Sequence, residues 1–332
     1  MKNKKILIIG GTGALGKALL DKYKDENELF VMSRKEHTQE AFKRYYPDIK
    51  FKIGNVEYKD SIRRTLLEFK PQVIINTAAL KTVAVCQDNP FESISINILG
   101  HQNIIDCVSE LSVPGFCLET LVFVSTDKAC NPINVYGMSK SIAEQLYVNF
   151  SKVQSDIKCV LVRYGNVLNS TGSIIPVFKK MIDNGRKVLP ITDPDMTRFL
   201  ITLEDSTELI DWAISHPESH GKITVPKLKA LNLLDIAEQI SKACGIIEMK
   251  YNVIGAFDGE KVHEEMISIH EWPRTIDRGK YFLIGSERVS KNNELHSYNS
   301  KDCIAEGEDR NRLCELIRKF TETSNEFNMK EF

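Results

Sequence analysis

The sequence lacks any long hydrophobic run and any large excess of one charge. Its apolar runs are far shorter than the ~20 residues that a membrane-spanning helix requires. The 332 residues include 44 lysines and arginines against 45 aspartates and glutamates, so the net charge is −1. This balance argues against nucleic acid or an anionic membrane as the main partner. We therefore expect a globular protein that binds neither, and the chain contains no internal repeat or low-complexity linker.

Paired cysteine motifs and metal-ligating clusters are missing as well. The eight cysteines have no CxxC spacing, and several, such as Cys107 and Cys159, lie in apolar stretches. This pattern is typical of reduced thiols in a cytoplasmic protein rather than of disulfides or a zinc site. The run His263-Glu264-Glu265 does not have the HExxH spacing of a zinc-binding helix. We therefore expect no metal.

Short apolar runs alternate with helical segments through the first half of the chain. The predicted strands are residues 5–10, 28–32, 49–53, 72–76, 120–125 and 159–164. The predicted helices are residues 14–24, about 60–69, about 91–110 and 137–152. Continuous β-branched runs are typical of buried parallel strands. The alternation predicts the α/β class, with a Rossmann-like doubly wound parallel sheet and right-handed crossovers.

The first strand begins after the basic segment Met1–Lys5 and leads directly into glycines without a cleavage site. We interpret this start as a strand and not as a signal peptide.

The pattern loosens after Tyr164. Residues 165–200 are rich in glycine, proline, asparagine and aspartate; a helix is predicted at 203–214, a short strand at 223–226 and an amphipathic helix at 231–244. We predict an NADP-binding Rossmann domain over 1–166, with returning segments near 197–226. Residues 167–332 are predicted to form a smaller α/β substrate-binding C-terminal region of interleaved pieces, loop-rich from about 255.

The charged tail from about 305 keeps Leu313, Ile317 and Phe320 at helical spacing. Such a tail can pack on the body of the protein, pack on a second subunit, or fray.

A glycine loop follows the first predicted strand and opens the first predicted helix. Its glycines, Gly10, Gly13 and Gly16, allow a tight turn, a close approach of the backbone to a pyrophosphate, and close helix packing. The helix amino terminus adds N–H donors and a positive dipole. The loop predicts a dinucleotide site that also includes Thr12, Ala14 and Leu15.

The end of the second strand favours NADP over NAD. An acidic residue at this place would accept the ribose 2′-hydroxyl of NAD, but the chain has Ser33, Arg34 and Lys35, with no acid before Glu36. A guanidinium can grip a 2′-phosphate with two hydrogen bonds. The alternative is that Arg34 is an ordinary solvated loop charge.

The segment Ser125–Lys140 places several titratable side chains directly after the buried run 121–124. Tyr136 and Lys140 are four residues apart and share one helix face. An ammonium there lowers the pKa of the phenol, so that the phenolate can take a proton from a sugar hydroxyl. The alternatives are a solvated helix pair for Tyr136 and Lys140, and a surface ion pair for Asp127 and Lys128.

With these motifs the sequence resembles the extended short-chain dehydrogenase/reductases and, among them, the UDP-N-acetylglucosamine 4,6-dehydratases. Four blocks carry the resemblance, at residues 78–100, 124–140, 163–178 and 191–205, and a weaker fifth lies at 259–268. Together with the glycine loop they span residues 5 to about 270.

The resemblance implies a hydro-lyase that oxidises C4 of the sugar with bound NADP⁺, eliminates water across C5 and C6, and returns the hydride to C6. The implied roles are Tyr136 as base for the C4 hydroxyl, Lys140 as its electrostatic partner and ribose ligand, Thr126 as hydrogen-bonding orienter, Asp127 as acid for the C6 hydroxyl, and Lys128 as base at C5. This assignment requires a raised pKa for Asp127 and a lowered pKa for Lys128.

The resemblance implies further ligand positions. On the cofactor side these are Asn55, Val56, Ala78, Ala79 and Lys81, with Asn55 where the family usually has an acid beside the adenine; an amide can still bond the adenine amino group. On the substrate side these are Lys81, Asn166, Gly172, Ser173, Arg198 and Glu264. Asn166, Gly172 and Ser173 are expected to face the diphosphate and Arg198 to pair with phosphate, whereas Glu264 either binds a ribose hydroxyl or is solvated.

Several alternatives stay open. Some of these dehydratases have methionine at the position of Tyr136, and tyrosine resembles those that invert C5, so we predict inversion. The rivals are a C5-retaining dehydratase, a dehydratase of another NDP-hexose such as dTDP-glucose, a 4-epimerase, and a non-catalytic NADP-binding protein. The Asp127–Lys128 pair speaks against an epimerase, which has no need of it, and the complete set of reactive residues speaks against a non-catalytic protein.

A UDP-sugar is the expected partner, together with further copies of the chain. By analogy with related folds, the helices at 91–110 and 137–152 are candidate subunit contacts. The oligomeric state, the NDP-sugar and the downstream glycan pathway are left open by the sequence.

Overall fold

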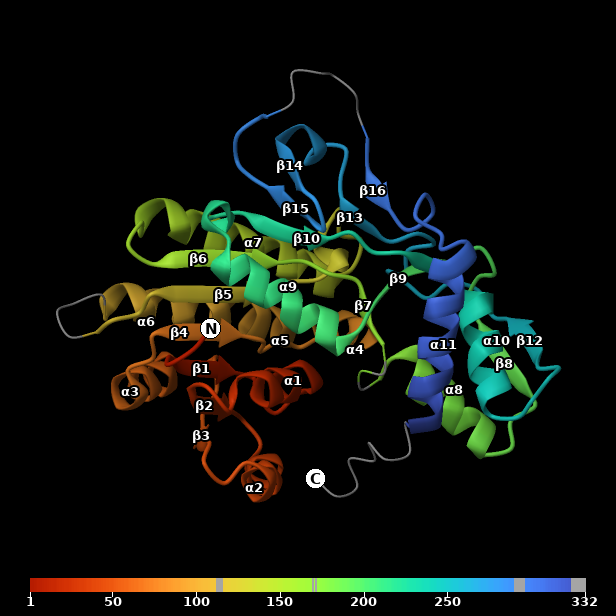
Figure 1. Cartoon of the computed structure of the whole chain (residues 1–332), viewed down its shortest axis with the longest axis horizontal. Coiled ribbons are helices and arrows are strands. Elements are labelled where there is room, and N and C mark those ends of the chain that lie inside the picture. The colour runs from red at the N-terminus through yellow and green to blue at the C-terminus, as the bar shows by residue number, and fades with distance from the viewer. Residues whose placement is uncertain (112–115, 169, 171, 290–295, 324–332) are drawn as a thin grey trace.

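The computed structural model describes residues 1–111, 116–168, 170, 172–289 and 296–323 (Figure 1). Its main element is a nine-stranded sheet of order β14-β15-β10-β6-β5-β4-β1-β2-β3. These strands are β1 Lys5–Ile9, β2 Glu28–Ser33, β3 Lys50–Ile53, β4 Val73–Asn76, β5 Thr120–Val124, β6 Lys158–Val162, β10 Ile223–Pro226, β14 Thr275–Arg278 and β15 Tyr281–Ile284. All strands from β10 to β3 are parallel. The predicted α/β class and all six predicted strands of the first half are confirmed.

Helices cover both faces of this sheet. The helices α1 (Ala14–Tyr23) and α9 (Leu203–Ser215) pack on one face, and α3 (Lys59–Phe69), α6 (Gly100–Glu110) and α7 (Val135–Val153) pack on the other. Along β1, Leu7 and Ile9 enter one core while Ile6 and Ile8 enter the opposite one. Burying each such side chain stabilises the fold by roughly 1.5–3 kcal/mol. The strand is therefore apolar on both faces, which is why its sequence does not alternate.

The predicted helix at about 91–110 is interrupted. It consists of α5 (Pro90–Ile94), a π-helical turn (Ser95–Leu99) and α6, and it follows the short helix α4 (Val83–Asp88). Asn97, in the π turn, accepts a hydrogen bond from Leu80 N and donates one to Leu80 O, each at 2.8 Å. π turns are frequent at functional sites. This one holds the chain after β4 against the helices.

A smaller lobe contains the elements that the loose second half of the sequence did not reveal. These are β7 Asn166–Val167, α8 Ile174–Asp183, β8 Val188–Ile191, β9 Thr197–Ile201, β11 Ala230–Asn232, β12 Lys250–Val253, β13 Glu265–Ile267 and β16 Tyr298–Asn299. The same lobe contains α10 Leu233–Ala243, which confirms the amphipathic helix predicted at 231–244. β11, β9 and β7 form one small sheet, and β12 pairs with β8 in another. Helix α2 (Glu36–Tyr45), which covers the main sheet beside β3, was also not predicted.

The charged tail forms helix α11 (Gly307–Thr323), which packs on α8 and α10 (Figure 1). Ile317 is fully buried in the same core cluster as Ile175, Leu189 and Ile236. Of the three alternatives for the tail, packing on the body is therefore confirmed up to Thr323. Residues 324–332 lie outside the described part of the chain.

None of the helices in the described ranges is long and apolar enough to cross a membrane. The same ranges contain no group of three or more histidine, cysteine, aspartate or glutamate side chains arranged to hold a metal ion.

A buried ion network ties the main sheet to the C-terminal segment. Arg163, directly after β6 and 1% exposed, donates to both carboxylate oxygens of Glu144 at 3.0 and 2.6 Å and to both of Glu271 at 3.0 and 2.9 Å. It also donates to the Met266 carbonyl at 2.8 Å, and Ser125 donates to Glu144 at 2.6 Å. Despite desolvation, Arg163 lowers the pKa of Glu271 to about 2. The network therefore joins β6, α7 and the segment around β13.

Replacing Arg163 by methionine leaves Glu144 and Glu271 buried without their cation. Because breaking a buried pair leaves uncompensated charge, we expect the free energy of unfolding to fall by about 3–5 kcal/mol. Urea titration of the purified variants measures it. The control is Glu208→Ala, which breaks the exposed Lys280–Glu208 pair and should cost less than about 1 kcal/mol. Equal effects of the two substitutions would contradict a structural role for the network.

Candidate active site

One large cavity, of about 1180 Å³, lies between the carboxyl ends of the sheet strands and the smaller lobe. It is larger than the 300–1,000 Å³ of a typical single-ligand pocket, so it has room for a dinucleotide and a sugar nucleotide. The predicted residues that line it are Gly10, Thr12, Gly13, Ala14, Leu15, Gly16, Ser33, Arg34, Lys35, Asn55, Val56, Ala78, Ala79, Lys81, Thr126, Lys128, Tyr136, Lys140, Asn166, Gly172, Ser173 and Arg198. Asp127 and Glu264 lie behind this lining, each in contact with Lys128.

The glycine loop has two positions that only glycine fits and one that is open. Gly10 has φ +81°, and a Cβ there would lie 2.8 Å from Ala78 N. At Gly16 a Cβ would lie 2.3 Å from the Gly11 carbonyl oxygen, whereas at Gly13 the nearest atom is 3.6 Å away. Gly13 is the N-cap of α1 and lines the cavity. The loop therefore leaves room for phosphate beside Gly13, at the positive end of the helix.

The residues at the end of β2 and β3 form the outer part of the cavity. Ser33 is buried and accepts a hydrogen bond from Gln39 Nε2 at 2.9 Å, while Arg34 is exposed. Asn55 Nδ2 donates to the Glu57 carboxylate at 2.8 Å, and Asn55 Oδ1 accepts from the backbone N–H of Glu57 at 3.2 Å. The amide of Asn55 thus has one N–H left for a base.

Tyr136 and Lys140 lie in the first turns of α7, whose N-cap Asn134 accepts from Gly137 N at 2.7 Å. Lys140 donates to the Val124 carbonyl at 2.7 Å, and its ammonium lies 4.1 Å from the centroid of the Phe123 ring. Burial lowers the pKa of Lys140 to about 7. Each of these contacts aims Lys140 at the carboxyl end of β5.

The expected lowering of the Tyr136 pKa is not found. Burial raises the pKa of Tyr136 to about 12, although the charge of Lys128 and a hydrogen bond with Thr126 act in the opposite direction. The cation that acts on the phenol is Lys128 rather than Lys140. The physical reason is that burial removes water from the phenol and from Lys140 together, so neither easily keeps a charge.

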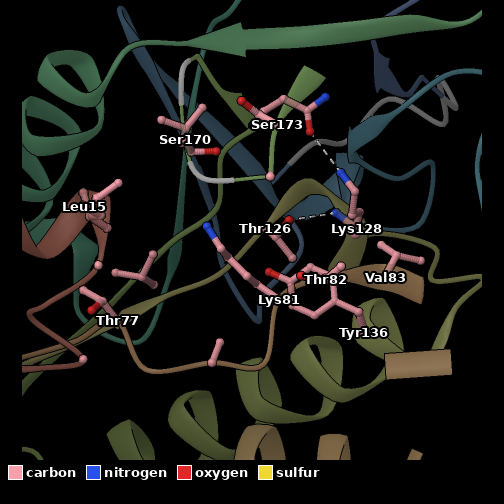
Figure 2. Close-up of a pocket in the computed structure, with 18 of the residues that line it drawn as sticks. Leu15, Thr77, Lys81, Thr82, Val83, Thr126, Lys128, Tyr136, Ser170 and Ser173 are labelled. Carbon is pink, nitrogen blue, oxygen red and sulfur yellow. Dashed lines mark hydrogen bonds between the residues drawn. The ribbon is translucent and has the colours of Figure 1, made fainter. Parts of the chain in front are cut away.

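Lys128 lies at the centre of three acceptors. Its ammonium is 3.1 Å from Asp127 Oδ1, 3.2 Å from Glu264 Oε1 and 3.2 Å from Asn166 Oδ1. Lys81, Thr126, Lys128 and Tyr136 surround the same part of the cavity (Figure 2). Asp127 is 1% exposed and accepts from Thr126 Oγ1 at 2.9 Å, so it is not the surface ion pair of the alternative interpretation.

The proposed roles require a raised pKa for Asp127 and a lowered pKa for Lys128, and only the first is found. Burial raises the pKa of Asp127, and nearby Glu264 adds to the rise against the opposing charge of Lys128. Desolvation lowers the pKa of Lys128, but the carboxylates of Asp127 and Glu264 outweigh it, so its pKa lies above the usual value. The condition on Asp127 is met, whereas the expected lowering for Lys128 is not found because two carboxylates face one ammonium.

The expected phosphate ligands also line the cavity. Arg198 donates to Glu260 Oε1 at 2.9 Å and to the carbonyls of Thr197 and Val262 at 2.9 and 3.1 Å. Ser173 is the N-cap of α8, and its buried hydroxyl has no hydrogen-bond partner in the described part of the chain. Lys81 lines the cavity, and the partial loss of water around its ammonium lowers its pKa.

Sequence reasoning missed three contacts of the site. Glu264 is 2% exposed, which excludes the solvated alternative, and it lies against Lys128. Asn166 binds the same ammonium, and Glu260 is paired with Arg198. No motif could indicate these pairs, because their members lie between 38 and 136 positions apart and meet only through the fold.

A parallel sheet, a glycine loop opening α1 and a Tyr136/Lys140 pair at the end of β5 together define an extended short-chain dehydrogenase/reductase. The chain belongs to the family described as polysaccharide biosynthesis protein, whose model matches residues 6–286. The resemblance drawn from the sequence motifs is thereby confirmed.

Two curated relatives are similar over most of their length. The chain is 36% identical to "UDP-N-acetylglucosamine 4,6-dehydratase (inverting)" of Campylobacter jejuni, over 89% of this chain and 87% of the relative. It is 33% identical to a protein named "UDP-glucose 4-epimerase" from Rickettsia canadensis, over 90% of this chain and 92% of the relative. Among solved structures, that of Pen from Bacillus thuringiensis matches with a TM-score of 0.85 and 29% identity, over 96% of this chain and 98% of that chain.

Alanine substitutions at Gly13 and Gly16 should separate ligand binding from folding. Gly16→Ala forces a methyl group into the Gly11 backbone, so we expect a loss of about 1–3 kcal/mol of stability. Gly13→Ala meets no atom closer than 3.6 Å, so stability should change by less than about 1 kcal/mol. Its methyl group nevertheless blocks the approach of a pyrophosphate, and dinucleotide affinity should fall at least about tenfold. Thermal unfolding and fluorescence titration measure the two effects; unchanged affinity in Gly13→Ala would contradict the phosphate site.

Proposed function

We propose that the protein is a sugar-nucleotide 4,6-dehydratase. It converts UDP-N-acetylglucosamine to a UDP-2-acetamido-2,6-dideoxy-hexos-4-ulose, with inversion at C5. The main observation behind this proposal is the buried Asp127–Lys128 pair beside Tyr136 in the cavity. The C. jejuni relative named for this activity supports the choice of substrate and of inversion.

The cofactor we propose is NADP, which when bound accepts the hydride from C4 and returns it to C6. The support is the fit of the glycine loop to a pyrophosphate and the presence of Ser33 and Arg34 where an NAD enzyme has an acid. Arg34 and Lys35 would bind the 2′-phosphate. Asn55 and Val56 would bind the adenine, while Ala78, Ala79 and Lys81 would lie along the cofactor.

Tyr136 is the proposed base for the C4 hydroxyl. Burial raises the pKa of its phenol to about 12, against the charge of Lys128 and a hydrogen bond with Thr126, so the phenol must first lose its own proton to the cavity, which Tyr136 lines. Lys140, held by the Val124 carbonyl, would bind the ribose of the cofactor and, when protonated, act as the electrostatic partner of the phenol. The proton of the C4 hydroxyl passes to Tyr136 when the hydride leaves the same carbon.

Asp127 and Lys128 carry out the elimination. Asp127 has a raised pKa and a buried Oδ2 with no partner among the described residues, so it can hold a proton for the leaving C6 hydroxyl. Lys128 must first lose one proton before it can accept the C5 proton. With Asp127 already holding its proton, the ammonium of Lys128 loses one proton to solvent in the cavity, which Lys128 lines, and the neutral amine then accepts the C5 proton.

The diphosphate of the substrate would lie between Arg198 and the amino terminus of α8. Ser173 has an unpartnered hydroxyl there within the described ranges, and Gly172 has an open surface with φ +78°. A phosphate at this place would bind Arg198, either together with Glu260 or instead of it. We assign residues 1–166, with returning segments near 197–226, to cofactor binding and residues 167–332 to substrate binding.

We further propose a cytoplasmic homo-oligomer. All eight cysteines lie in the described part of the chain and are free, as expected in a reducing compartment. Exposed apolar side chains gather on α5, the π turn and α7, with Phe91 72%, Leu99 52% and Met138 48% exposed. A second copy of the chain would cover them.

The 4-epimerase is the second candidate, because the Rickettsia relative bears that name. An epimerase needs a base and a hydride acceptor at C4 but has no leaving group at C6. It therefore gives no reason to bury Asp127 against Lys128. The two activities differ in product, so one assay separates them.

Incubation with UDP-N-acetylglucosamine in heavy water, followed by NMR, tests the proposal. We expect a 4-keto-6-deoxy product with one deuterium at C5 and inverted configuration, because C5 regains its proton from the solvent-exchanged site. A C4 epimer without loss of water would identify an epimerase. Deuterium at C5 with retained configuration would reject inversion and keep dehydration.

Lys128→Ala should abolish exchange at C5. General base catalysis contributes about 10²–10⁴-fold, and turnover should fall by that factor while dinucleotide affinity stays within about twofold. Lys227→Ala is the control, since its ammonium pairs with the exposed Asp277 and not with the cluster around Lys128. Normal turnover in Lys128→Ala would remove Lys128 from this role.

Arg34→Ala should lose the preference for NADP. A hydrogen bond to a charged group contributes about 1.5–3 kcal/mol, so NADP affinity should fall by about 10- to 100-fold while NAD affinity changes little. Isothermal titration with both dinucleotides measures the ratio, and NAD serves as the internal control. An equal loss for both would mean that Arg34 supports the fold of the loop and does not read the phosphate.

A further inference from the structure

Glu264 is a buried carboxylate for which dehydration as described above needs no role. It lies directly before β13, and its backbone is fixed on both sides: its N–H donates to Ser300 Oγ and its carbonyl accepts from Ser300 N, each at 2.8 Å. Its Oε1 is 3.2 Å from Lys128 Nζ and 3.9 Å from Arg198 Nε. Its Oε2 is buried and has no partner among the described residues. An isolated charge is costly to bury, and the two cations near Oε1 reduce that cost for the Glu264 carboxylate.

The hydrogen bonds of Lys128 leave no donor unused. An ammonium has three N–H groups, and Asp127, Glu264 and Asn166 are its three acceptors. Glu264 is the only one of the three that reaches Lys128 from the C-terminal segment. It therefore sets where the ammonium lies relative to Asp127.

The two carboxyl groups around Lys128 are not equivalent. Glu264 faces three cations, Lys128, Arg198 and Lys261, and although desolvation opposes them, they hold its pKa below the usual value. Asp127 faces Lys128 alone among cations, accepts from Thr126, and lies near the negative charge of Glu264, and burial raises its pKa. When two carboxyl groups share a site, the one with fewer cations keeps the proton.

We propose that Glu264 is a positioning residue whose ionised carboxylate anchors Lys128 and carries the negative charge of this cluster, so that Asp127 is the carboxyl that stays protonated. This inference rests on the proposed function for its chemical purpose, which is to keep an acid ready for the C6 hydroxyl. Glu264 is not itself part of the cavity lining; it lies behind Lys128, which is, and acts through Lys128 and Asp127. In this arrangement the proton on Asp127 is lost at lower pH when Glu264 has no charge.

The test is Glu264→Gln, which keeps the shape and removes the charge. Loss of that charge lowers the pKa of Asp127, and an acid is active only while it is protonated, so the alkaline limb of the kcat profile should move to lower pH. The pKa of Lys128 should fall as well, since one of the carboxylates that raise it is gone, so the whole profile should move to lower pH. At pH 8 we expect kcat to fall about tenfold or more, with KM for the UDP-sugar within about twofold.

Two further variants serve as controls. Glu265→Gln changes the next residue, whose carboxylate accepts from Asn131 and not from Lys128, and its pH profile should match that of the wild type. Glu264→Asp keeps the charge and should restore the profile at least in part. Thermal unfolding of each variant shows that it is folded.

An infrared measurement tests the protonation without substrate. The wild type should show the C=O stretch of a protonated carboxyl at neutral pH, assigned to Asp127 by its loss in Asp127→Asn. In Glu264→Gln this band should disappear at lower pH than in the wild type. This measurement needs no turnover. If the wild type makes no keto sugar, the proposed function is rejected, but the infrared test of Glu264 and Asp127 is still valid.

Three results would overturn the inference. The first is a pH profile of Glu264→Gln that superposes on that of the wild type, whatever the loss in kcat. The second is a rise in KM with an unchanged profile, which would make Glu264 a substrate ligand, one of the two alternatives that the sequence left open. The third is an infrared band that is lost in Glu264→Gln but kept in Asp127→Asn.

Discussion

The buried contact of Arg163 with Glu144 and Glu271 is the interaction on which the rest of the site depends. Glu144 lies one helical turn after Lys140 and accepts from Ser125, next to the reactive segment. Glu271 belongs to the segment that follows β13, and thus to the part of the chain that brings Glu264 to Lys128. A planar guanidinium can hold two carboxylates at fixed angles, which an ammonium cannot. The end of β6, helix α7 and the segment after β13 are thereby held together at the carboxyl ends of β5 and β6.

A shortage of cations then determines the chemistry of the cavity. Lys128 faces Asp127 and Glu264, and Arg198 faces Glu260 and Glu264. In a site with little water, each carboxylate left without its own cation tends to take a proton. Asp127 is that group, because it shares Lys128 with Glu264, whereas Glu264 also lies near Arg198. The same two carboxylates keep Lys128 protonated, so the acid is ready before the base, and the base forms only when Lys128 releases a proton to solvent in the cavity.

Much of the fold could be predicted because it is encoded locally. The six apolar strands, the glycine loop and the Tyr136/Lys140 spacing all occupy short windows whose patterns have one physical meaning. The elements that were missed have weaker local signals. Helix α8 lies in a stretch rich in glycine, proline, asparagine and aspartate, and the four-residue strands β14 and β15 join the main sheet only as an antiparallel edge. Their positions depend on partners far away in the chain.

The sequence by itself determined the sheet, the phosphate loop and the identity of the reactive side chains, because periodicity and glycine spacing act within one or two elements. Only the tertiary structure decided the charge states. The pKa of Tyr136 rises because burial outweighs the nearby cation, and the pKa of Lys128 rises because the charges of Asp127 and of the distant Glu264 together outweigh its burial. Electrostatic energies depend on distances through space and on lost hydration. Both exist only once segments more than one hundred residues apart have packed together.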